Sequence, residues 1–212
     1  KSGTGKVRRV CIQAVNYPEA FKDVVSLIKL IRSTTNVPIS LSCQPFRGEQ
    51  LHILAEIGLD RIGIPLDAAT EDIFIDIKGM KAGGTYMWKD HLEALRTAVK
   101  VFGRGHVSTH FIVGLGETDA QLLAIIQEMV DMGVYPSLFA FTPIKGTALD
   151  NRPQPPLARY RRIQVAHHLI TVEKTSYSTM KFGEEGDLKD YGVSPENLEK
   201  IIESGKPFLT SG

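Results

Sequence analysis

The chain has 212 residues, of which 42% are hydrophobic and 23% charged, an ordinary composition for a globular domain. Its formal charge is only +1, from 25 basic and 24 acidic side chains, which argues against a nucleic-acid-binding surface. No window reaches the roughly 20 apolar residues of a membrane span, so no membrane partner is expected. Two cysteines and the lack of a secretory signal favour a cytoplasmic location, and the first residue is Lys1 rather than Met, so we expect the natural start to lie upstream.

Apolar periodicity predicts strands and helices that alternate along the chain. In order, we expect a strand at 7–15, a helix at 18–33, a strand at 37–42, a helix at 48–57, a strand at 59–66, helices at 70–78 and 90–102, a strand at 107–113, a helix at 119–132, a strand at 137–142 and a helix at 157–171. Such βα units predict a parallel sheet. From about Thr175 the sequence becomes polar and glycine-rich, with a short helix that Ser194 and Pro195 begin and Gly205 ends.

Both an open doubly wound sheet and a closed barrel fit alternating βα units. Strands covered by helices on both faces are nearly all apolar, but here Ser40 and Ser42 alternate with Ile39 and Leu41, and Ser108 and His110 alternate with Thr109, Phe111 and Val113. One apolar and one polar face suit a barrel that holds a polar ligand. We therefore predict an α/β fold, a partial (βα)6 TIM-type barrel of parallel strands at 1–174 that lacks its first strand, with a C-terminal extension packed on it at 175–212.

The stretch around the fourth predicted strand carries the clearest functional signal. Gly114-Leu115-Gly116-Glu117-Thr118 forms a turn after the strand, and Thr118 with Gln121 makes a capping box for the next helix. Glycines there let the backbone approach a ligand closely, and ligands bind at the carboxyl ends of parallel strands. A second turn, at 143–147, follows the fifth predicted strand.

Three motifs resemble those of radical S-adenosylmethionine (SAM) enzymes. The run from Ile112 to Glu117 resembles the G-x-I-x-G-x-x-E pattern of their fifth strand, with His110 in place of the first glycine. Residues 61–70 resemble the fourth strand of biotin synthase-like members, where an Asn-x-Asp pair handles the SAM ribose; Asp67 matches the Asp, and Pro65 replaces the Asn. The segment 141–147 resembles the sixth-strand turn. Over roughly 7–171, the chain is similar to biotin synthase-related proteins, including the second subunit of a two-protein lipoyl synthase.

This resemblance implies SAM and a [4Fe–4S] cluster as cofactors. The family binds the cluster through a Cys-x3-Cys-x2-Cys loop, which this sequence lacks. Cys11 and Cys43 lie on different predicted strands and cannot replace three thiolates of one loop, so we expect both to be buried thiols and no metal ligand within the chain. The segment 1–7 resembles the linker after the cluster loop, and 205–212 the approach to a second cysteine-rich motif. The hypothesis is that the chain is the middle of a longer enzyme, with a second auxiliary [4Fe–4S] cluster.

The resemblance also implies an activity and a set of cofactor contacts. The activity is formation of a 5′-deoxyadenosyl radical for C–H activation, including sulfur insertion of the lipoyl or biotin synthase kind. The substrate is a small molecule or an octanoyl group bound to a lipoyl domain, with a partner subunit. The residues implied in SAM binding are Ala14, Val15 and Asn16 at the amino group, Asp67 at the ribose, Ile112, Gly114 and Phe141 at the adenine, and in addition Ser42, His110, Glu117 and Thr142. No catalytic side chain is identified.

Simpler roles remain open for these residues. Gly114 and Gly116 also suit an ordinary turn, Glu117 favours a helix N-terminus electrostatically, and Asp67 suits the end of a strand. Two other functions also remain open: a cluster-free aldolase or lyase with Lys78 or Lys145 as its Schiff-base nucleophile, and a non-catalytic barrel subunit. His167 and His168 are adjacent on a predicted helix and point in different directions, which makes a metal pair unfavourable.

Overall fold

The computed structural model describes residues 7–209, and its contacts divide the chain into two compact units. Of the described residues, the first unit contains 7–65, 89–109 and 132–134, and the second contains 66–88, 110–131 and 135–209. Most of the opening segment expected to resemble a linker, 1–6, and the last three residues of the C-terminal one, 210–212, lie outside the described part. Within it, no helix combines the length and apolar character needed to cross a membrane.

The five predicted parallel strands are confirmed. They form one sheet in the order β1-β2-β3-β4-β5, so each strand is next to its predecessor in the sequence. Their bounds are β1 (Val10–Gln13), β2 (Ile39–Ser42), β3 (Arg61–Gly63), β4 (Val107–Val113) and β5 (Val134–Ala140). The pairs β1–β2, β2–β3 and β3–β4 are parallel.

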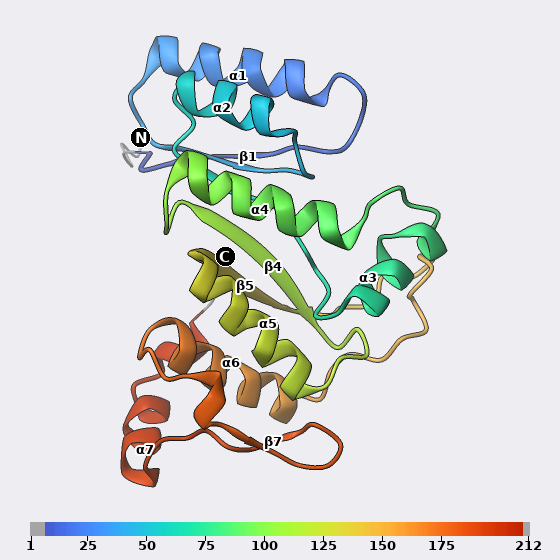
Figure 1. Ribbon diagram of the computed structural model, residues 1–212, viewed down its shortest axis with the longest axis vertical. Coiled ribbons are helices and arrows are strands. Elements are labelled where there is room, and N and C mark those ends of the chain that lie inside the picture. The colour runs from blue at the N-terminus through green and yellow to red at the C-terminus, as the bar shows by residue number, and fades with distance from the viewer. Residues whose placement is uncertain (1–6, 210–212) are drawn as a thin grey trace, which may run out of the picture. The chain divides into compact units, whose positions relative to one another are not determined.

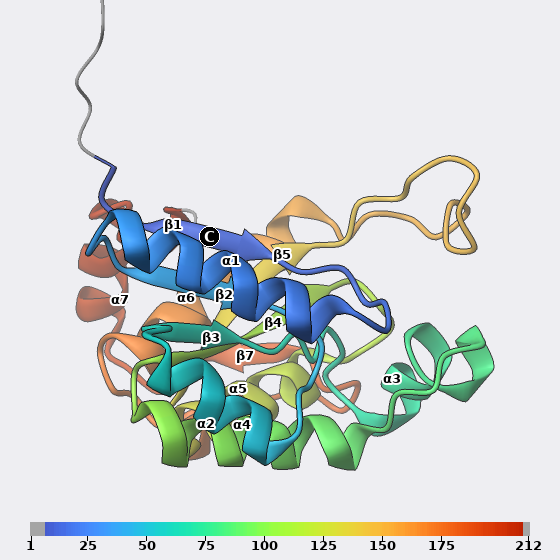
Figure 2. The same cartoon turned by 90° about the horizontal axis from the view of Figure 1, so that it is seen from above.

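In the first unit, helices bury an apolar stripe on the strands. These helices are α1 (Ala20–Thr34), α2 (Gly48–Glu56) and α4 (Trp88–Phe102). The fully buried Ile28, Leu54 and Leu95 belong to these three helices, one to each. Figure 1 shows α1 and α2 on the same side of β1, and Figure 2 shows β1, β2 and β3 next to one another in that order.

The second unit contains most of the remaining elements. Its helices are α3 (Glu71–Ile77), α5 (Asp119–Met132), α6 (Leu157–Thr171) and α7 (Pro195–Glu203), with short 3-10 turns η1 (Met80–Ala82), η2 (Tyr177–Thr179) and η3 (Lys206–Phe208). An antiparallel hairpin, β6 (Lys181–Phe182) and β7 (Leu188–Asp190), follows α6 in the orange to red part of Figure 1. The segment expected to be a C-terminal extension is therefore part of this unit.

Two predicted helix starts are confirmed. At α5, the Gln121 amide donates to Thr118 Oγ1 at 3.1 Å, and the Thr118 amide donates to Gln121 Oε1 at 2.9 Å, which completes a capping box. At α7, the amide of Asn197 donates to Ser194 Oγ at 3.3 Å, and Pro195 occupies the first helical position. Both starts follow from local sequence alone.

The predicted alternation of the strands is also confirmed, although several strand limits were wrong. Along β4, residues 107, 109, 111 and 113 are buried, whereas 108, 110 and 112 are half-buried. The strand expected at 7–15 extends only from Val10 to Gln13, and the strand expected at 137–142 begins at Val134. The strand expected at 59–66 is limited to Arg61–Gly63.

Candidate cofactor-binding site

Asp67 lies where the ladder between β3 and β4 is interrupted. The Ile64 amide donates to the Ser108 carbonyl at 2.9 Å, and the next amide to reach β4 is that of Asp67, which donates to the His110 carbonyl at 2.8 Å. The ladder thus skips one residue, as in a bulge. Asp67 adopts a left-handed backbone with φ of +67°, which is unusual for a residue other than glycine. The bulge therefore sets the direction of this one side chain.

The Asp67 carboxylate is held by an ion pair. Its Oδ2 accepts a hydrogen bond from Lys78 Nζ at 2.7 Å, and the two side chains are 22% and 10% exposed. Lys78 is the residue directly after α3, and its Nζ lies 5.9 Å from the ring centroid of Phe74 and 5.8 Å from that of Tyr86. Ring faces attract an ammonium group at this distance. The predicted Schiff-base candidate Lys78 thus holds Asp67 in place.

A cavity of about 380 Å³ opens beside Asp67 in the second unit. It lies at the carboxyl ends of β4 and β5, where parallel folds bind ligands. Five of its seven lining residues are among those predicted to contact SAM: Asp67, His110, Ile112, Phe141 and Thr142. The other two, Phe139 and Ala140, were missed, although their place at the end of a predicted strand was a usable signal. The cavity combines apolar walls with one carboxylate.

His110 lies in the wall of this cavity, where burial favours its neutral form. Its ring meets that of Phe139 edge to face, with 5.1 Å between centroids. Burial lowers the pKa of His110, an effect that nearby Lys78 reinforces and Asp67 opposes. Burial also lowers the pKa of His167 on α6, whose Nε2 lies 2.6 Å from the Pro136 carbonyl. A neutral imidazole at position 110 presents both a donor and an acceptor.

These two histidines predict a loss of stability in mild acid. Because the pKa of each is lower in the folded chain, the unfolded chain binds protons that the folded chain does not as pH falls below about 6.5. The free energy of unfolding, measured in urea, should therefore fall between pH 7.5 and 5.5. The double variant H110Q/H167Q should lose part of this dependence, whereas H106Q, at an exposed site, should keep it. If the unfolding free energy of the wild type and of both variants changed equally with pH, His110 and His167 would not be the source of the pH dependence.

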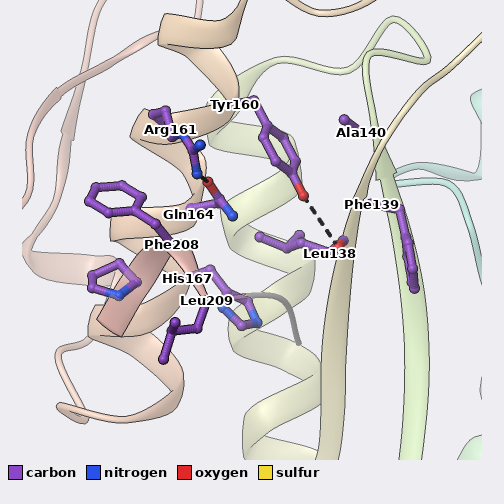
Figure 3. Close-up of a pocket in the computed structure, with 10 residues that line it drawn as sticks. Leu138, Phe139, Ala140, Tyr160, Arg161, Gln164, His167, Phe208 and Leu209 are labelled. Carbon is purple, nitrogen blue, oxygen red and sulfur yellow. Dashed lines mark hydrogen bonds between the residues drawn. The ribbon is translucent and has the colours of Figure 1, made fainter. Parts of the chain in front are cut away.

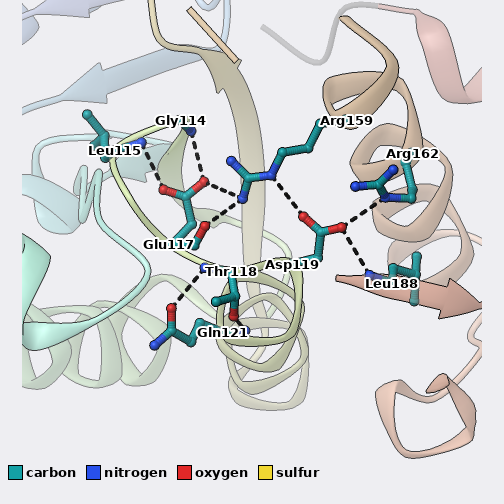
Figure 4. A network of polar contacts seen from close by, with 9 residues as sticks. All are labelled: Gly114, Leu115, Glu117, Thr118, Asp119, Gln121, Arg159, Arg162 and Leu188. Carbon is teal, nitrogen blue, oxygen red and sulfur yellow. Dashed lines mark hydrogen bonds and ion pairs between the residues drawn. The ribbon is translucent and has the colours of Figure 1, made fainter. Parts of the chain in front are cut away.

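Glu117 and Gly114 shape the turn after β4 (Figure 4). The Glu117 carboxylate accepts the Gly114 amide at 2.8 Å and the Leu115 amide at 2.9 Å, and Glu117 is only 5% exposed. Gly114 has φ of +105°, and a Cβ there would lie 2.9 Å from Pro155 Cδ, so only glycine fits. Neither residue is among those that line the cavity. Their contact with SAM stays a prediction.

The predicted contacts at the start of the chain belong to the first unit. Ala14 continues β1, since its amide donates to the Ser42 carbonyl at 2.9 Å, and Val15 and Asn16 follow on the exposed surface. Ser42 was also predicted to contact SAM. For Ala14, Val15, Asn16 and Ser42, contact with SAM remains a prediction.

The two cysteines differ, and the prediction for one of them was wrong. Cys43 is buried as expected, and burial raises its pKa to about 12. Cys11 is exposed, because β1 directs Ile12 inward and the residues beside it outward. Within residues 7–209, no group of three cysteine, histidine or acidic side chains is placed to hold a metal ion. The described residues therefore do not provide the ligand set of an iron–sulfur cluster.

Thiol labelling should separate the two cysteines. In the folded chain, Cys11 should react with an aromatic disulfide reagent at neutral pH, whereas Cys43 should react only after denaturation, because the reactive species is the thiolate. We expect C11S to abolish labelling of the folded chain and C43S to leave it unchanged. Fast labelling of C11S would contradict the burial of Cys43.

Other predicted positions have ordinary surroundings. Lys145, the second Schiff-base candidate, is exposed in the turn after β5. His168 Nε2 lies 3.5 Å from Glu173 Oε1, while the His167 ring is directed to the Pro136 carbonyl. The two adjacent histidines thus have separate partners, in agreement with the sequence expectation.

A second cavity, of about 360 Å³, lies between β5, α6 and η3 in the same unit (Figure 3). The Arg161 guanidinium lies 5.1 Å from the Phe208 ring centroid and donates to Gln164 Oε1 at 2.8 Å. Tyr160 donates weakly to the Leu138 carbonyl, at 3.4 Å. None of the residues predicted to contact SAM lines this second cavity.

Comparison with known proteins agrees with the motifs. Residues 4–129, more than half of the chain, match the family model described as the radical SAM superfamily. A bacteriochlorophyllide c C-7(1)-hydroxylase from Chlorobaculum limnaeum is 27% identical over 153 residues, which are 65% of this chain and 37% of the relative. A biotin synthase from Natronomonas pharaonis is 26% identical over 196 residues, which are 92% of this chain and 50% of the relative. The chain thus spans half or less of these curated relatives.

Solved structures resemble the fold. The [FeFe]-hydrogenase maturase HydG has a TM-score of 0.64 at 17% identity, over 80% of this chain and 40% of its own. Methylornithine synthase (PylB) has a TM-score of 0.65 at 16% identity, over 79% of this chain and 49% of its own. At such identities the likeness concerns the fold alone, and it confirms the expected α/β class with the parallel strands of a partial barrel.

Proposed function

Because the chain belongs to the radical SAM superfamily, we propose that the cavity beside Asp67 is the SAM site of an enzyme that activates a C–H bond. The observation that carries this proposal is the composition of the cavity. Five residues at motif positions of the family line it together, although they come from three separate segments: Asp67, then His110 and Ile112, then Phe141 and Thr142.

The residues around the cavity suit the nucleoside part of SAM. The volume of about 380 Å³ lies within the range of small-molecule sites. Ile112 and Phe141 offer apolar surface for a base, and Phe141 is only 8% exposed. Asp67 offers a carboxylate that accepts hydrogen bonds from ribose hydroxyls. The pairing of apolar wall and single carboxylate favours a nucleoside over a wholly polar ligand.

The chain itself contributes positioning and the exclusion of water. When bound, SAM and a [4Fe–4S] cluster supply the radical chemistry of the family. Lys78 holds the Asp67 carboxylate in one orientation, and the Phe139 ring holds His110. A ligand fixed in this way reacts in a defined geometry rather than after a random encounter. The described residues provide no ligand set for the cluster.

The finer parts of the proposal concern the whole protein. One relative is named as a hydroxylase and the other as a biotin synthase, which supports an organic substrate. Within that class we propose a small molecule or an octanoyl group on a lipoyl domain, with sulfur insertion as the reaction. Cluster ligands outside this chain, a second auxiliary cluster, a partner subunit and a cytoplasmic location belong to the same proposal.

Filling the cavity tests where SAM binds. In the reconstituted full-length protein, equilibrium dialysis should show that T142W raises the Kd for SAM by at least about tenfold, a loss of about 1.4 kcal/mol, because the indole enters the cavity. The matched variant I144W adds an indole to the same turn at an exposed residue that does not line the cavity, and should bind SAM like the wild type. Unchanged binding by T142W would place SAM elsewhere.

A further inference from the structure

We propose that Arg159 is a positioning residue that holds the glycine turn at 114–117 in its ligand-binding shape, an inference that rests on the proposed SAM site. Arg159 lies in the first turn of α6, and it matches none of the motifs that point to the family. The turn begins directly after Val113, the last residue of β4. The inference concerns a side chain that is 42 residues from Glu117 in the sequence.

Arg159 donates three hydrogen bonds here, two to Glu117 in the turn and one to Asp119 at the start of α5 (Figure 4). Its Nη2 donates to the Glu117 carbonyl at 2.7 Å and to Glu117 Oε1 at 3.0 Å, and its Nε donates to Asp119 Oδ1 at 2.9 Å. The same Glu117 carboxylate accepts the amides of Gly114 and Leu115. One guanidinium therefore fixes the carboxylate that folds the turn onto itself.

The carboxylates of Glu117 and Asp119 are buried, so they depend on the arginine side chains that pair with them. The side chains of Glu117 and Asp119 are 1% and 2% exposed, and that of Arg159 is 20% exposed. Carboxylates removed from water need partners with good geometry. The rigid, planar guanidinium holds its donors in a fixed fork, whereas an ammonium group is a compact charge with rotatable donors on a flexible stem. Lysine at position 159 would keep the charge but lose part of the bonding.

Backbone connects the turn at 114–117 to the wall of the cavity, through chain continuity and one hydrogen bond. The Val113 carbonyl, one residue before the turn, accepts the amide of the lining residue Phe141 at 2.9 Å, and Ile112, one residue further back, also lines the cavity. Pro155, just before α6, occupies the space that a Cβ on Gly114 would need. A displacement of the turn is therefore transmitted to Ile112 and Phe141, the two apolar walls proposed for the base.

Arg162 provides a matched comparison. Its Nε donates to Asp119 Oδ2 at 2.9 Å, and the Leu188 amide of the hairpin donates to the same oxygen at 3.1 Å. Arg162 is three residues after Arg159 on the same helix and shares Asp119 with it, whereas the ion pair with Glu117 is made by Arg159. It supports the carboxylate and the hairpin rather than the turn.

The test compares R159K with R162K in the reconstituted full-length protein. Amide hydrogen exchange should accelerate at Gly114 and Leu115 in R159K and stay at the wild-type rate in R162K, and this readout does not depend on SAM. In equilibrium dialysis, R159K should raise the Kd for SAM by about tenfold or more, and R162K by less than about twofold. The urea midpoints of the two variants report general loss of stability, which is common to both substitutions.

The outcomes separate the two proposals. If wild-type protein does not bind SAM, the proposed function fails, whatever the exchange rates show. If the wild type binds SAM, but R159K and R162K have equal exchange at the turn or equal affinity, Arg159 has only a structural role and the positioning proposal is overturned. Faster exchange together with weaker binding in R159K alone supports it.

Discussion

Replacing Asp119 with asparagine is expected to lower the free energy of unfolding by about 3–5 kcal/mol, the largest effect on stability that we predict. Asp119 is 2% exposed and accepts bonds from Arg159, Arg162 and the Leu188 amide. The asparagine amide keeps the size of the side chain but removes the charge that two guanidinium groups share. Urea unfolding followed by circular dichroism measures the change.

An exposed ion pair of the same unit provides the control. Asp76 bonds to Lys81 at 2.7 Å, but the two side chains are 51% and 67% exposed. Surface pairs of this kind contribute little to stability, so D76N should leave the free energy of unfolding nearly unchanged. If D76N and D119N lost similar amounts of unfolding free energy, burial would not be the reason for the contribution of the Asp119 network to stability.

Replacing Asp67 with asparagine is expected to weaken SAM binding by roughly 10- to 100-fold, because hydrogen bonds to a charged group contribute about 1.5–3 kcal/mol. Asparagine tolerates the left-handed backbone that Asp67 adopts, at φ of +67°. The substitution therefore removes the carboxylate and its ion pair with Lys78 while the bulge is kept. Equilibrium dialysis of SAM with the reconstituted full-length protein measures the loss.

The matched control for this substitution is D150N. Asp150 Oδ2 accepts the Gly146 amide at 3.0 Å in the loop after β5, and the residue does not line the cavity. Its replacement should leave the Kd for SAM within about twofold of the wild type. If D67N binds SAM as tightly as D150N, the carboxylate has no part in binding, and the assignment of the ribose contact is wrong.

The local chemistry of the chain made much of the fold predictable. The capping box at Thr118 and Gln121 needs only neighbouring residues, and so does the alternation along β4 that directs His110 and Ile112 to one face. Because carboxyl ends of parallel strands meet at one edge of a sheet, the motif residues on successive strands were expected to lie together. Asp67, Phe141 and the β4 residues do so.

Long-range pairing was beyond the sequence. Arg159 and Glu117 are 42 residues apart, and Arg162 and Asp119 are 43 apart, and their pairing depends on how α6 packs on the start of α5. Two arginines three residues apart on a helix share a face, which in hindsight was a weak signal. The exposure of Cys11 was missed for a similar reason, since the direction of a short strand is set by its pairing and by the burial of Ile12.

The bulge at Asp67 shows how tertiary structure determines a functional side chain. Pro65 was noted only as a departure from the Asn-x-Asp pattern, but it lies inside the interruption of the ladder, between the amides of Ile64 and Asp67 that reach β4. A regular strand would place residue 66 in the bridge to Phe111 where the structure has Asp67. The sequence motif identified the residue, whereas its orientation and its ion pair with Lys78 came from the fold.

The most direct test of the central claim is formation of 5′-deoxyadenosine by the full-length protein. The protein would be reconstituted anaerobically with iron and sulfide, reduced with dithionite and incubated with SAM, and the nucleoside would be quantified by liquid chromatography. We predict 5′-deoxyadenosine from the wild type and a strongly reduced amount from D67N. A protein that incorporates iron and sulfide, binds SAM and yet forms no nucleoside would contradict the proposed radical activity.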